Sequence, residues 1–354
     1  MNTIILTCAG RAERFAKWGG SKWRLTHPSG NIMAAESLRS LGPVIGSWQI
    51  VIALNAHDCA RYDAASVRRE FVLALGLPED QIRVVSVGTT ATRAETVLLA
   101  GAAAELRAED AVCVRDCDNA LRFALAPENA VAVADMTECG AIDAGARSFV
   151  TIGEDRVVGM AQERGMVTRW FCAGAYVFEN WETARSLLVG GSHMTDAIRR
   201  GSEQGVRFAA RVVSGYEDWG TGQEWSEMRS SYRTIFVDVD GVLLATAHRS
   251  FYPTWGSSEP LLKNCAAMRD LYDTGRVHIV LTTSRPESLR EDTTRQLAAA
   301  GVRFHRLVMD LPACGRVLIN DVVPTRGERT ADALNVPRDT DGSLADSLFS
   351  LRLG

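Results

Sequence analysis

Short apolar runs alternate with amphipathic stretches through the first two thirds of the chain. The runs are rich in Val, Ile and Leu, which is typical of strands buried in a sheet. One stretch between them, Thr92–Leu106, carries a Thr-x-x-Glu capping box and an Ala/Leu-rich continuation, which predicts a helix. This alternation predicts an α/β sheet with helices on its faces. The expected strands are Ile4–Leu6, Trp48–Leu54, Ile82–Val87, Ala111–Val114, Val131–Ala134 and Phe149–Ile152.

A second α/β pattern follows a polar patch at residues 224–233. It opens with an apolar run at 234–243 and continues with an amphipathic segment, Leu261–Tyr272, which ends before Gly275. Because a chain of 354 residues exceeds the usual size of a single core, we expect about two domains, residues 1–229 and 230–354. The later elements expected are a helix at 286–300 and strands near 277–282, 304–309 and 316–321.

The composition is that of an ordinary globular protein, with 46% hydrophobic and 23% charged residues. A net charge of −4 argues against the binding of a nucleic-acid polymer. The eight cysteines are scattered and include no C-x-x-C pair, so we expect reduced thiols rather than a zinc site or disulfides. No apolar run has the length of a membrane span, and the first residues do not resemble a secretory leader. These features predict a cytoplasmic protein with no membrane partner.

The first expected strand leads into a cationic loop. After Gly10 the chain places Arg11, Arg14, Lys17 and Lys22 close together in sequence. A loop that leaves the carboxyl end of a parallel strand can turn N–H groups and basic side chains toward phosphate oxygens. The spacing matches neither the P-loop nor the dinucleotide-binding fingerprint. The loop therefore indicates phosphate binding, with a solvated surface turn as the alternative.

Two carboxylates follow the strand expected at residues 111–114. Asp116 and Asp118 fall at the carboxyl end of this strand, where α/β sheets bind ligands. Carboxylate oxygens are hard ligands that suit Mg²⁺ carried on nucleotide phosphates. Side chains two residues apart share one face of a strand, so both carboxylates reach one ion if the strand continues. An Asp-Asn turn formed by Asp118 and Asn119 is the structural alternative.

The opening stretch resembles that of the sugar-phosphate nucleotidyltransferases, whose signature is a strand, then A-G-x-x-x-R-F or a close variant, then a lysine. The resemblance implies a Rossmann-like sheet of the GT-A type, and it implies that Arg14 and Lys22 neutralise a triphosphate. Ser21 stands where the family usually has proline. The signature residues are Ala9, Gly10, Arg14, Phe15 and Lys22. The resemblance places the nucleotide against Ala9, Gly10, Arg11, Thr92 and Glu95, although a helix cap alone also explains the last two.

Further matches to this family follow in order up to about residue 228. Glu163 and Arg164 stand where the family has a sugar-contacting Glu-Lys pair; ordinary solvated charges are the alternative. Gly174 lies in a strand similar to N-T-G-I-Y-V-F and would let a sugar approach the backbone, unless it marks a bulge. The D-W-G-T segment resembles the family's D-x-G-T, which implies that Asp218 joins Asp118 in holding Mg²⁺.

The run T-I-F-V-D-V-D-G-V-L at residues 234–243 is the most specific motif of the chain. Two aspartates at a strand end can take separate roles in phosphoryl transfer. Asp238 could attack phosphorus, and Asp240 could protonate the leaving oxygen. The run resembles motif I of the phosphatases of the haloacid dehalogenase (HAD) superfamily. That resemblance implies a second Mg²⁺, held by Asp238, Asp321 and the main-chain carbonyl of Asp240.

The rest of the HAD pattern also follows in order. Thr283, or the adjacent Thr282, matches motif II, and Arg316 takes the place of the motif III cation. Asp321 takes the place of the motif IV metal ligand. Arg316 replaces the commoner lysine, and Asn320 replaces a commoner second acid. Too few residues separate motifs I and II for a cap domain, so the resemblance implies a Rossmannoid HAD-like domain without a large cap.

Together the two resemblances imply a bifunctional enzyme that uses Mg²⁺ in both domains. The N-terminal domain would transfer a nucleotidyl group from an NTP, with CTP favoured, to a sugar or polyol phosphate and release pyrophosphate. The C-terminal domain would hydrolyse a sugar phosphomonoester through an aspartyl-phosphate at Asp238. The pairing of these activities is typical of nucleotide-sugar biosynthesis for capsule polysaccharide or glycoconjugates, an association by resemblance.

Three alternatives stay open at this point. One domain could be active while the other is a non-catalytic scaffold. The chain could instead be a nucleotide-sensing binding protein without turnover. The acceptor could also be a non-sugar alcohol phosphate. The sequence leaves open whether the chain forms a homo-oligomer.

Overall fold

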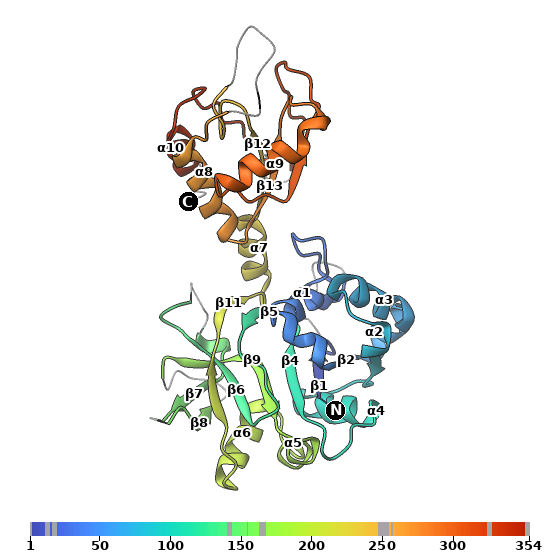
Figure 1. The fold of residues 1–354 in the computed structure, drawn as a ribbon. Coiled ribbons are helices and arrows are strands. Elements are labelled where there is room, and N and C mark those ends of the chain that lie inside the picture. The colour runs from blue at the N-terminus through green and yellow to red at the C-terminus, as the bar shows by residue number, and fades with distance from the viewer. Residues whose placement is uncertain are drawn as a thin grey trace. The chain divides into compact units, whose positions relative to one another are not determined.

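The computed structural model of the chain divides into two compact units, Met1–Arg229 and Ser230–Gly354 (Figure 1). The structure describes residues 2–10, 15, 20–139, 144–153, 155–162, 168–246, 255, 258–323 and 328–350. Each unit buries apolar side chains of its own.

A mixed β-sheet forms the middle of the first unit. Its strands are β1 (Thr3–Thr7), β2 (Gln49–Leu54), β3 (Ile82–Ser86), β4 (Val112–Asp116), β6 (Ala130–Asp135), β7 (Phe149–Ile152), β8 (Val158–Gln162), β9 (Trp170–Phe178) and β10 (Ala209–Val212). The order is β10-β6-β9-β4-β1-β2-β3, and β7 pairs with β8 and β9. β1 runs parallel to β2 and β4, whereas β9 runs antiparallel to β4 and β6. All six strands expected from the sequence are confirmed, with ends within two residues.

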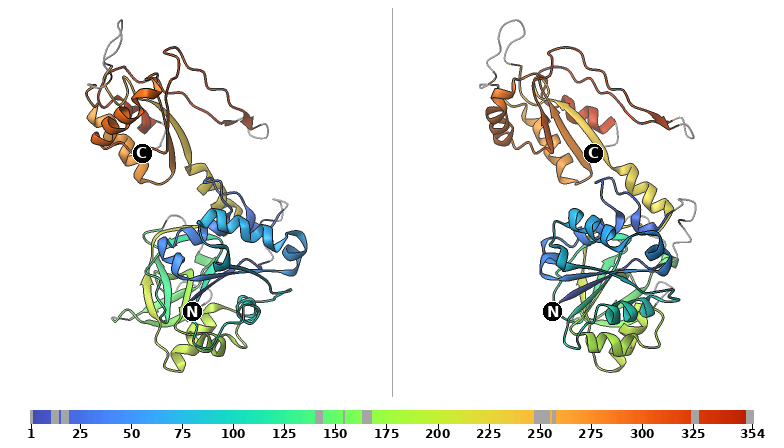
Figure 2. Two further views of the ribbon diagram at one scale, coloured as in Figure 1. Left: turned by 45° about the vertical axis from the view of Figure 1, so that its right-hand side comes forward. Right: turned by 90° about the vertical axis from the view of Figure 1, so that its right-hand side faces the viewer.

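Helices cover both faces of this sheet (Figures 1 and 2). They are α1 (Met33–Arg39), α2 (Ala56–Arg61), α3 (Ala64–Leu75), α4 (Arg93–Ala103), α5 (Trp181–Leu188) and α6 (Met194–Glu203). A further helix, α7 (Gly222–Ser231), follows them in the chain. Ile4 and Leu6 of β1 pack with α1 and α3, whereas Ile5 packs in the core that contains α4, α5 and α6. This division follows from the two-residue period of a strand. The expected helix at Thr92–Leu106 is confirmed as α4, which ends at Ala103.

A two-stranded ribbon continues from the end of β4. It consists of β5 (Asn119–Arg122) and β11 (Ser214–Asp218), which pair antiparallel with Asp218 opposite Asn119. The alternation of apolar residues did not predict either strand, because both are short and neither contains a run of apolar residues. Their pairing joins two segments that are far apart in the sequence.

The second unit has a three-stranded parallel sheet in the order β12-β13-β14. Its elements are β12 (Arg233–Asp238), α8 (Leu262–Asp273), β13 (Val277–Thr282), α9 (Arg290–Ala299), β14 (Arg306–Val308), β15 (Val322–Val323), β16 (Glu328–Arg329) and α10 (Ser343–Ser350). Met268 of α8 and Leu297 of α9 are buried with Ile279 of β13 in one core. The strand, helix, strand, helix, strand order agrees with the α/β pattern expected for this part.

One expected strand of the second unit does not form. No strand covers residues 316–321 of the structure, and Val317 and Ile319 are 87% and 90% exposed. A strand requires a neighbour that accepts and donates ladder hydrogen bonds, and the structure shows this apolar segment without one. Strand propensity alone was therefore a wrong guide at this position.

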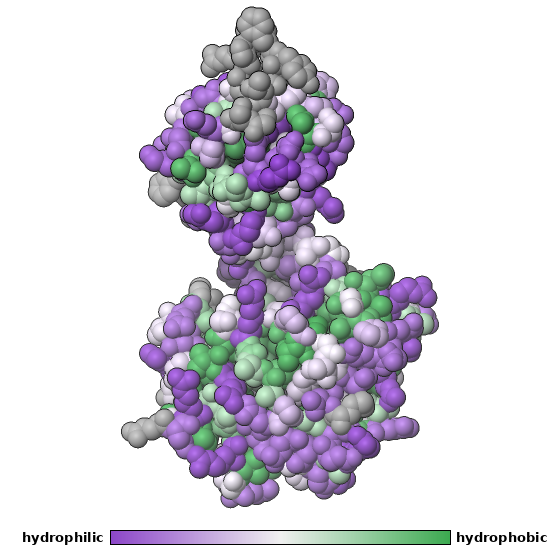
Figure 3. Space-filling model, in the orientation of Figure 1, coloured by the Kyte–Doolittle hydropathy of each residue, from purple (hydrophilic) through white to green (hydrophobic). Residues whose placement is uncertain are grey.

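Two further expectations concern the chain as a whole. No disulfide joins any of the eight cysteines, all of which lie in described residues. Within the described ranges, every helix is too short or too polar to cross a bilayer. On the face drawn in Figure 3, hydrophilic and hydrophobic side chains are interspersed over both units.

Candidate functional site

The ribbon of β5 and β11 brings two predicted metal ligands together. β4 ends at Asp116, and the chain bends through Asp118 before β5 begins. Asp218, the last residue of β11, lies opposite Asn119, and the backbone N–H of Trp219 donates to the carbonyl oxygen of Asp118 at 2.9 Å. Asp118 and Asp218 are therefore neighbours at the carboxyl end of β4. The strand does not continue to Asp118, so the shared strand face considered for Asp116 and Asp118 is wrong.

Lys22, the predicted triphosphate-binding lysine, lies at the same place. It opens a short 3₁₀ helix, Lys22–Arg24. Its Nζ forms an ion pair with Oδ2 of Asp118 and donates to the carbonyl oxygen of Gly220 at 3.0 Å. The Nζ also lies 4.8 Å from the ring centroid of Phe15. The structure thus brings together three of the residues that the sequence singled out, Lys22, Asp118 and Asp218.

Asp58, which the sequence analysis did not select, holds the Lys22 turn in place. Its carboxylate is 3% exposed and accepts hydrogen bonds from Ser21 Oγ and from Trp23 Nε1, the latter at 2.8 Å. These donors flank Lys22 on both sides. Asp58 itself is fixed because its N–H donates to the Asn55 side chain at the start of α2. An Asn at a strand end followed three residues later by an Asp is typical of the start of a helix. This signal could have located Asp58 in the first turn of α2, but it does not indicate the contacts of Asp58 with the Lys22 turn.

Replacement of Asp58 by alanine should destabilise the first unit by about 1–3 kcal/mol, because the buried Trp23 N–H loses its acceptor. Denaturant unfolding of the full chain measures this loss. Asp58→Asn keeps one carbonyl oxygen as an acceptor and should lose less. Equal stability of Asp58→Ala and the unchanged protein would mean that Asp58 does not hold the turn.

Arg93 is a second residue that the sequence analysis missed. It is the first residue of α4, and its Nη1 lies 3.1 Å from Oδ1 of Asp116. Thr92 and Glu95, the predicted nucleotide-binding residues near Arg93, form the N-terminal cap of α4. The N–H of Glu95 donates to Thr92 Oγ1 at 3.1 Å, and the Glu95 carboxylate accepts from the N–H of Ala91 at 2.8 Å. Nucleotide binding by Thr92 and Glu95 stays a prediction, and the capping alternative is observed.

The surrounding cations determine the charge of the carboxylates. Burial by itself would raise the pKa of Asp118, but the charge and hydrogen bond of Lys22, with Arg93 and Arg147, hold that pKa at about 2. For Asp116, burial is the largest effect; it raises the pKa despite Arg93, and the negative charge of Asp118 adds to the rise. Asp118 is therefore a carboxylate at neutral pH, as a metal ligand must be.

Arg147 pairs with the other predicted metal ligand. Its Nη2 forms an ion pair with Oδ2 of Asp218 and lies 3.3 Å from Oε1 of Glu224. Its Nη1 donates to the hydroxyl of Tyr216 at 3.3 Å, and the guanidinium lies 5.9 Å from the ring centroid of Phe171. No motif pointed to Arg147, because its partners come from β11 and α7, well separated from it in the sequence.

Gly174 of β9 lies against the strand end that carries the carboxylates. It has a φ of +85°, and a Cβ added there would lie 2.5 Å from Asn119 Nδ2 and 2.8 Å from Asp116 Oδ2. Its carbonyl oxygen accepts from the fully buried Arg115 at 3.1 Å. A close approach to the Gly174 backbone was expected from a sugar, and in the structure the side chains of Asn119 and Asp116 make it. Contact with a sugar at this position stays a prediction.

The other predicted residues of the first unit are placed only in part. Ala9 is 6% exposed, and its carbonyl oxygen accepts from Asn55 Nδ2 at 3.3 Å. Gly10, next in the chain, has nothing within 4 Å of an added Cβ. Both follow β1, beside β4. Four predicted residues lie outside the described part of the chain, namely Arg11, Arg14, Glu163 and Arg164.

The chemistry of the carboxylates in the first unit fits Mg²⁺. This ion keeps several waters and is commonly bound through one or two carboxylates together with substrate phosphates. Asp118 and Asp218 supply two neighbouring carboxylates, of which Asp118 is ionised at neutral pH. Among the described residues there is no group of three or more Asp, Glu, His or Cys side chains that could enclose a metal. The site therefore suits an ion that arrives with phosphate ligands.

In the second unit, Asp238 ends β12 and is paired with a cation. Arg316 Nη1 lies 3.0 Å from Oδ1 of Asp238, and that oxygen also accepts from the N–H of Val239 at 3.1 Å. Burial raises the pKa of Asp238 above its usual range, although Arg316 opposes the rise. The structure thus brings the predicted nucleophile and the predicted motif III cation into contact.

The predicted acid, Asp240, is fully engaged by neighbouring donors. Thr283 Oγ1 donates to its Oδ2 at 2.9 Å, and Arg285 donates to both of its oxygens at 2.8–3.1 Å. Arg285 is 1% exposed and also donates to Gln296 at 2.6 Å. No motif marked Arg285, although it lies only two residues after Thr283 in the sequence. Proton donation by Asp240 requires these donors to release it.

Asp321 lies in an exposed segment, where its Oδ1 accepts from Thr330 Oγ1 at 3.1 Å. Asp238, Asp240 and Asp321 are all described residues, and they do not form a group that could hold a metal. The residues present in this unit therefore do not fit the predicted Mg²⁺ site. Their role as metal ligands stays a prediction.

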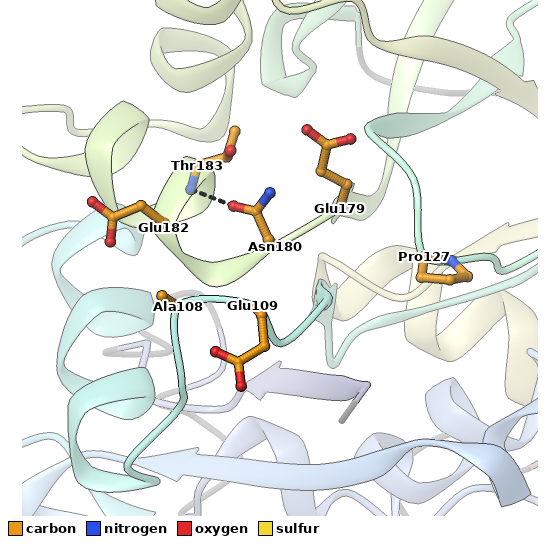
Figure 4. Close-up of a pocket in the computed structure, with 7 residues that line it drawn as sticks. All are labelled: Ala108, Glu109, Pro127, Glu179, Asn180, Glu182 and Thr183. Atoms are coloured by element: carbon orange, nitrogen blue, oxygen red, sulfur yellow. Dashed lines mark hydrogen bonds between the residues drawn. The ribbon is translucent and has the colours of Figure 1, made fainter.

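A hollow of about 740 Å³ lies elsewhere on the first unit (Figure 4). Val112 of β4 pairs with Phe178 of β9, so the loops before β4 and after β9 lie at the opposite end of β4 from Asp118. These loops supply most of the hollow. Its lining has three glutamates and no basic residue, which makes it unsuitable for phosphate. The lining residues are Ala108, Glu109, Pro127, Glu179, Asn180, Glu182 and Thr183.

Comparison with known proteins gives a structural match only. No family model and no curated protein sequence matches the chain. The N-terminal part is similar to the nucleoside-diphosphate-sugar pyrophosphorylase from Vibrio cholerae RC9, with 17% identity, a TM-score of 0.54, and coverage of 64% of this chain and 98% of that chain. A Bacillus anthracis protein assigned as a glucose-1-phosphate thymidylyltransferase, solved with sucrose, matches at 14% identity and a TM-score of 0.50, covering 65% of this chain and 94% of that chain.

These likenesses show the fold of the N-terminal unit, which is that of the sugar nucleotidyltransferases. At such low identity they show the fold alone. Since they cover about two thirds of the chain, the HAD-like fold of the C-terminal unit stays a prediction.

Proposed function

We propose that the N-terminal unit transfers a nucleotidyl group from an NTP to a sugar or polyol phosphate and releases pyrophosphate. The observation that carries this proposal is the convergence of Lys22, Asp118 and Asp218 at the carboxyl end of β4. One cation and two carboxylates at that edge suit a phosphate-bound divalent ion. The fold shared with sugar nucleotidyltransferases supports the same reading.

The residues of the site act by positioning and by charge. Lys22 stands beside the two aspartates and neutralises negative charge on the triphosphate. Asp118 and Asp218 would hold Mg²⁺, which when bound stabilises the charge on the leaving pyrophosphate. An oxygen of the acceptor phosphate forms a bond to the α-phosphorus while the bond from that phosphorus to the β-phosphate oxygen breaks. The attacking oxygen is already anionic at neutral pH, so the site needs no strong base.

The experiment that tests this function is a matrix of the four NTPs against sugar and polyol phosphates, with Mg²⁺ and the full-length chain. Pyrophosphate and free phosphate are followed in separate channels. We expect pyrophosphate from one NTP and one acceptor, and CTP is the nucleotide to test first. Nucleotide binding without pyrophosphate from any pair would overturn the proposal and identify a binding protein instead.

A second proposal concerns the C-terminal unit, which we infer to be a phosphomonoesterase. The contact between Asp238 and Arg316 is the observation that favours it, because it places a cation beside a strand-end carboxylate. The carboxylate forms a bond to phosphorus as the bond to the sugar oxygen breaks, and the leaving oxygen takes a proton from Asp240. A water molecule that gives a proton back to Asp240 then attacks the phosphorus, and the bond from phosphorus to the Asp238 oxygen breaks to regenerate the carboxylate.

Two such activities in one chain would act on successive intermediates. A phosphatase could remove one phosphate from a sugar before or after the nucleotidyl group is attached at another. Activated sugars for a capsule or glycoconjugate are the products that this pairing favours. The free-phosphate channel of the matrix, read with and without each NTP, gives the order of the two steps.

A further inference from the structure

Each of the two predicted metal ligands already carries its own cation. Lys22 pairs with Asp118, and Arg147 pairs with Asp218. The Asp218 side chain is 7% exposed and the Arg147 side chain is 15% exposed, so this second pair is largely removed from water. A carboxylate buried to this extent costs several kcal/mol without a counter-charge. Arg147 therefore supplies, in the ligand-free protein, the positive charge that a metal would supply.

Other contacts hold Arg147 at the site independently of Asp218. Glu224 Oε1 lies 3.3 Å from Nη2, and the Tyr216 hydroxyl accepts from Nη1 at 3.3 Å. If Asp218 turned to a metal, the guanidinium would stay beside it with donors available. A planar guanidinium is well suited to two oxygens of a phosphate.

We propose that Arg147 is a nucleotide-binding residue that exchanges Asp218 for a triphosphate oxygen when metal and nucleotide enter together. The inference rests on the nucleotidyltransferase function proposed for this unit. It assigns a role to a residue that no motif marked. It also makes the binding of the metal and the binding of the triphosphate interdependent.

The energetics of this exchange give it a measurable signature. A metal that binds alone must displace Arg147 from Asp218, and the guanidinium then keeps only the Glu224 carboxylate, at 3.3 Å, as a charged partner. A metal that arrives with a triphosphate leaves Arg147 paired with phosphate instead. The metal alone should therefore bind weakly, and triphosphate should strengthen its binding. Removal of the Arg147 charge should raise the affinity for the metal alone and remove most of that strengthening.

The test uses Mn²⁺ as the probe of the metal site, with the free ion measured by electron paramagnetic resonance in solutions of the full chain. Arg147→Gln should bind Mn²⁺ alone about 10-fold more tightly than the unchanged protein, equivalent to about 1.4 kcal/mol. Inorganic triphosphate should tighten Mn²⁺ binding to the unchanged protein about 10-fold more than to Arg147→Gln. Arg147→Lys retains the charge and should stay close to the unchanged protein.

Arg211→Gln is the matched control, because it removes another arginine of the same unit. Arg211 donates to Glu128 at 2.7 and 2.8 Å, away from the carboxylates of the site. Its loss should leave both Mn²⁺ titrations unchanged. Thermal unfolding of each variant separates a folding defect from a binding effect, and Arg147→Met, which also removes the charge, supplies a second variant should Arg147→Gln fail to fold.

The inference is overturned if Arg147→Gln binds Mn²⁺ alone no more tightly than the unchanged protein, or if triphosphate strengthens Mn²⁺ binding equally in both. Either result would make Arg147 a purely structural partner of Asp218 and Glu224. Failure of the proposed function is seen separately, as the absence of pyrophosphate from the unchanged protein. The Mn²⁺ titrations do not depend on turnover.

Discussion

Asp118→Asn should lower pyrophosphate release by about 10³-fold, since it removes a charge that holds the divalent ion on the triphosphate. Phosphate release from a monoester should continue, because that reaction is assigned to Asp238 in the other unit. Asp238→Asn should produce the opposite result, with phosphate release lost and pyrophosphate release retained. Separate assays of the two products in each purified variant measure this dissociation.

Asp155→Asn is the matched control for both variants. Asp155 pairs with Arg207 at an exposed position, where its side chain is 57% exposed, so neither product should change. Loss of both activities in Asp118→Asn or in Asp238→Asn, with folding intact, would contradict the assignment of two separate sites. Full pyrophosphate release by Asp118→Asn would remove Asp118 from the site altogether.

Gly174→Ala should be among the most destabilising small substitutions in the first unit, by about 2–4 kcal/mol. The backbone at Gly174 has a φ of +85°, which an L residue adopts only with strain. The added methyl group would also meet Asn119 Nδ2 at 2.5 Å and Asp116 Oδ2 at 2.8 Å. Both neighbours belong to the strand end that carries the carboxylates, so pyrophosphate release should fall with stability. Denaturant unfolding, followed by tryptophan fluorescence, measures the loss.

Gly190→Ala separates the two causes. Gly190 has a φ of +71°, and nothing lies within 4 Å of an added Cβ. This variant carries the backbone strain without the clash and should lose about 1 kcal/mol. If both variants lose equal stability, the contact with Asn119 and Asp116 contributes nothing, and Gly174 is required only for its backbone conformation.

Much of the first unit could be predicted from the chain because its strands are buried on both faces. Ile4, Ile5 and Leu6 are all fully buried, so the strand appears as an uninterrupted apolar run. The capping residues of α4 were equally visible, since Thr92 and Glu95 act within a single turn. β5 and β11 escaped prediction because each pairs with a segment that is distant in the sequence. β5 alternates buried and less buried residues over only four positions, and β11 has no fully buried residue.

The second unit shows where strand propensity stops being informative. The apolar residues 317–319 and the run that became β13 look alike in sequence. β13 lies between two partners, and Ile279 at its middle is fully buried. Residues 317–319 are exposed and belong to no strand. Hydrogen-bonding partners decide between these outcomes, and partners are not a property of the segment itself.

Motifs were sufficient to select residues that the fold brings together in pairs. Asp118 and Asp238 each follow an apolar run, Lys22 lies in the cationic loop after the first strand, and the resemblances selected Asp218 and Arg316. The folded chain alone decided what these residues face. Contacts between elements that are distant in sequence bring Asp58, Arg93 and Arg147 to the first site. Arg285 lies close to Thr283 in sequence, and the direction of its side chain brings it to Asp240. A motif records only the covalent order of residues, whereas the charge that faces each carboxylate is set by packing.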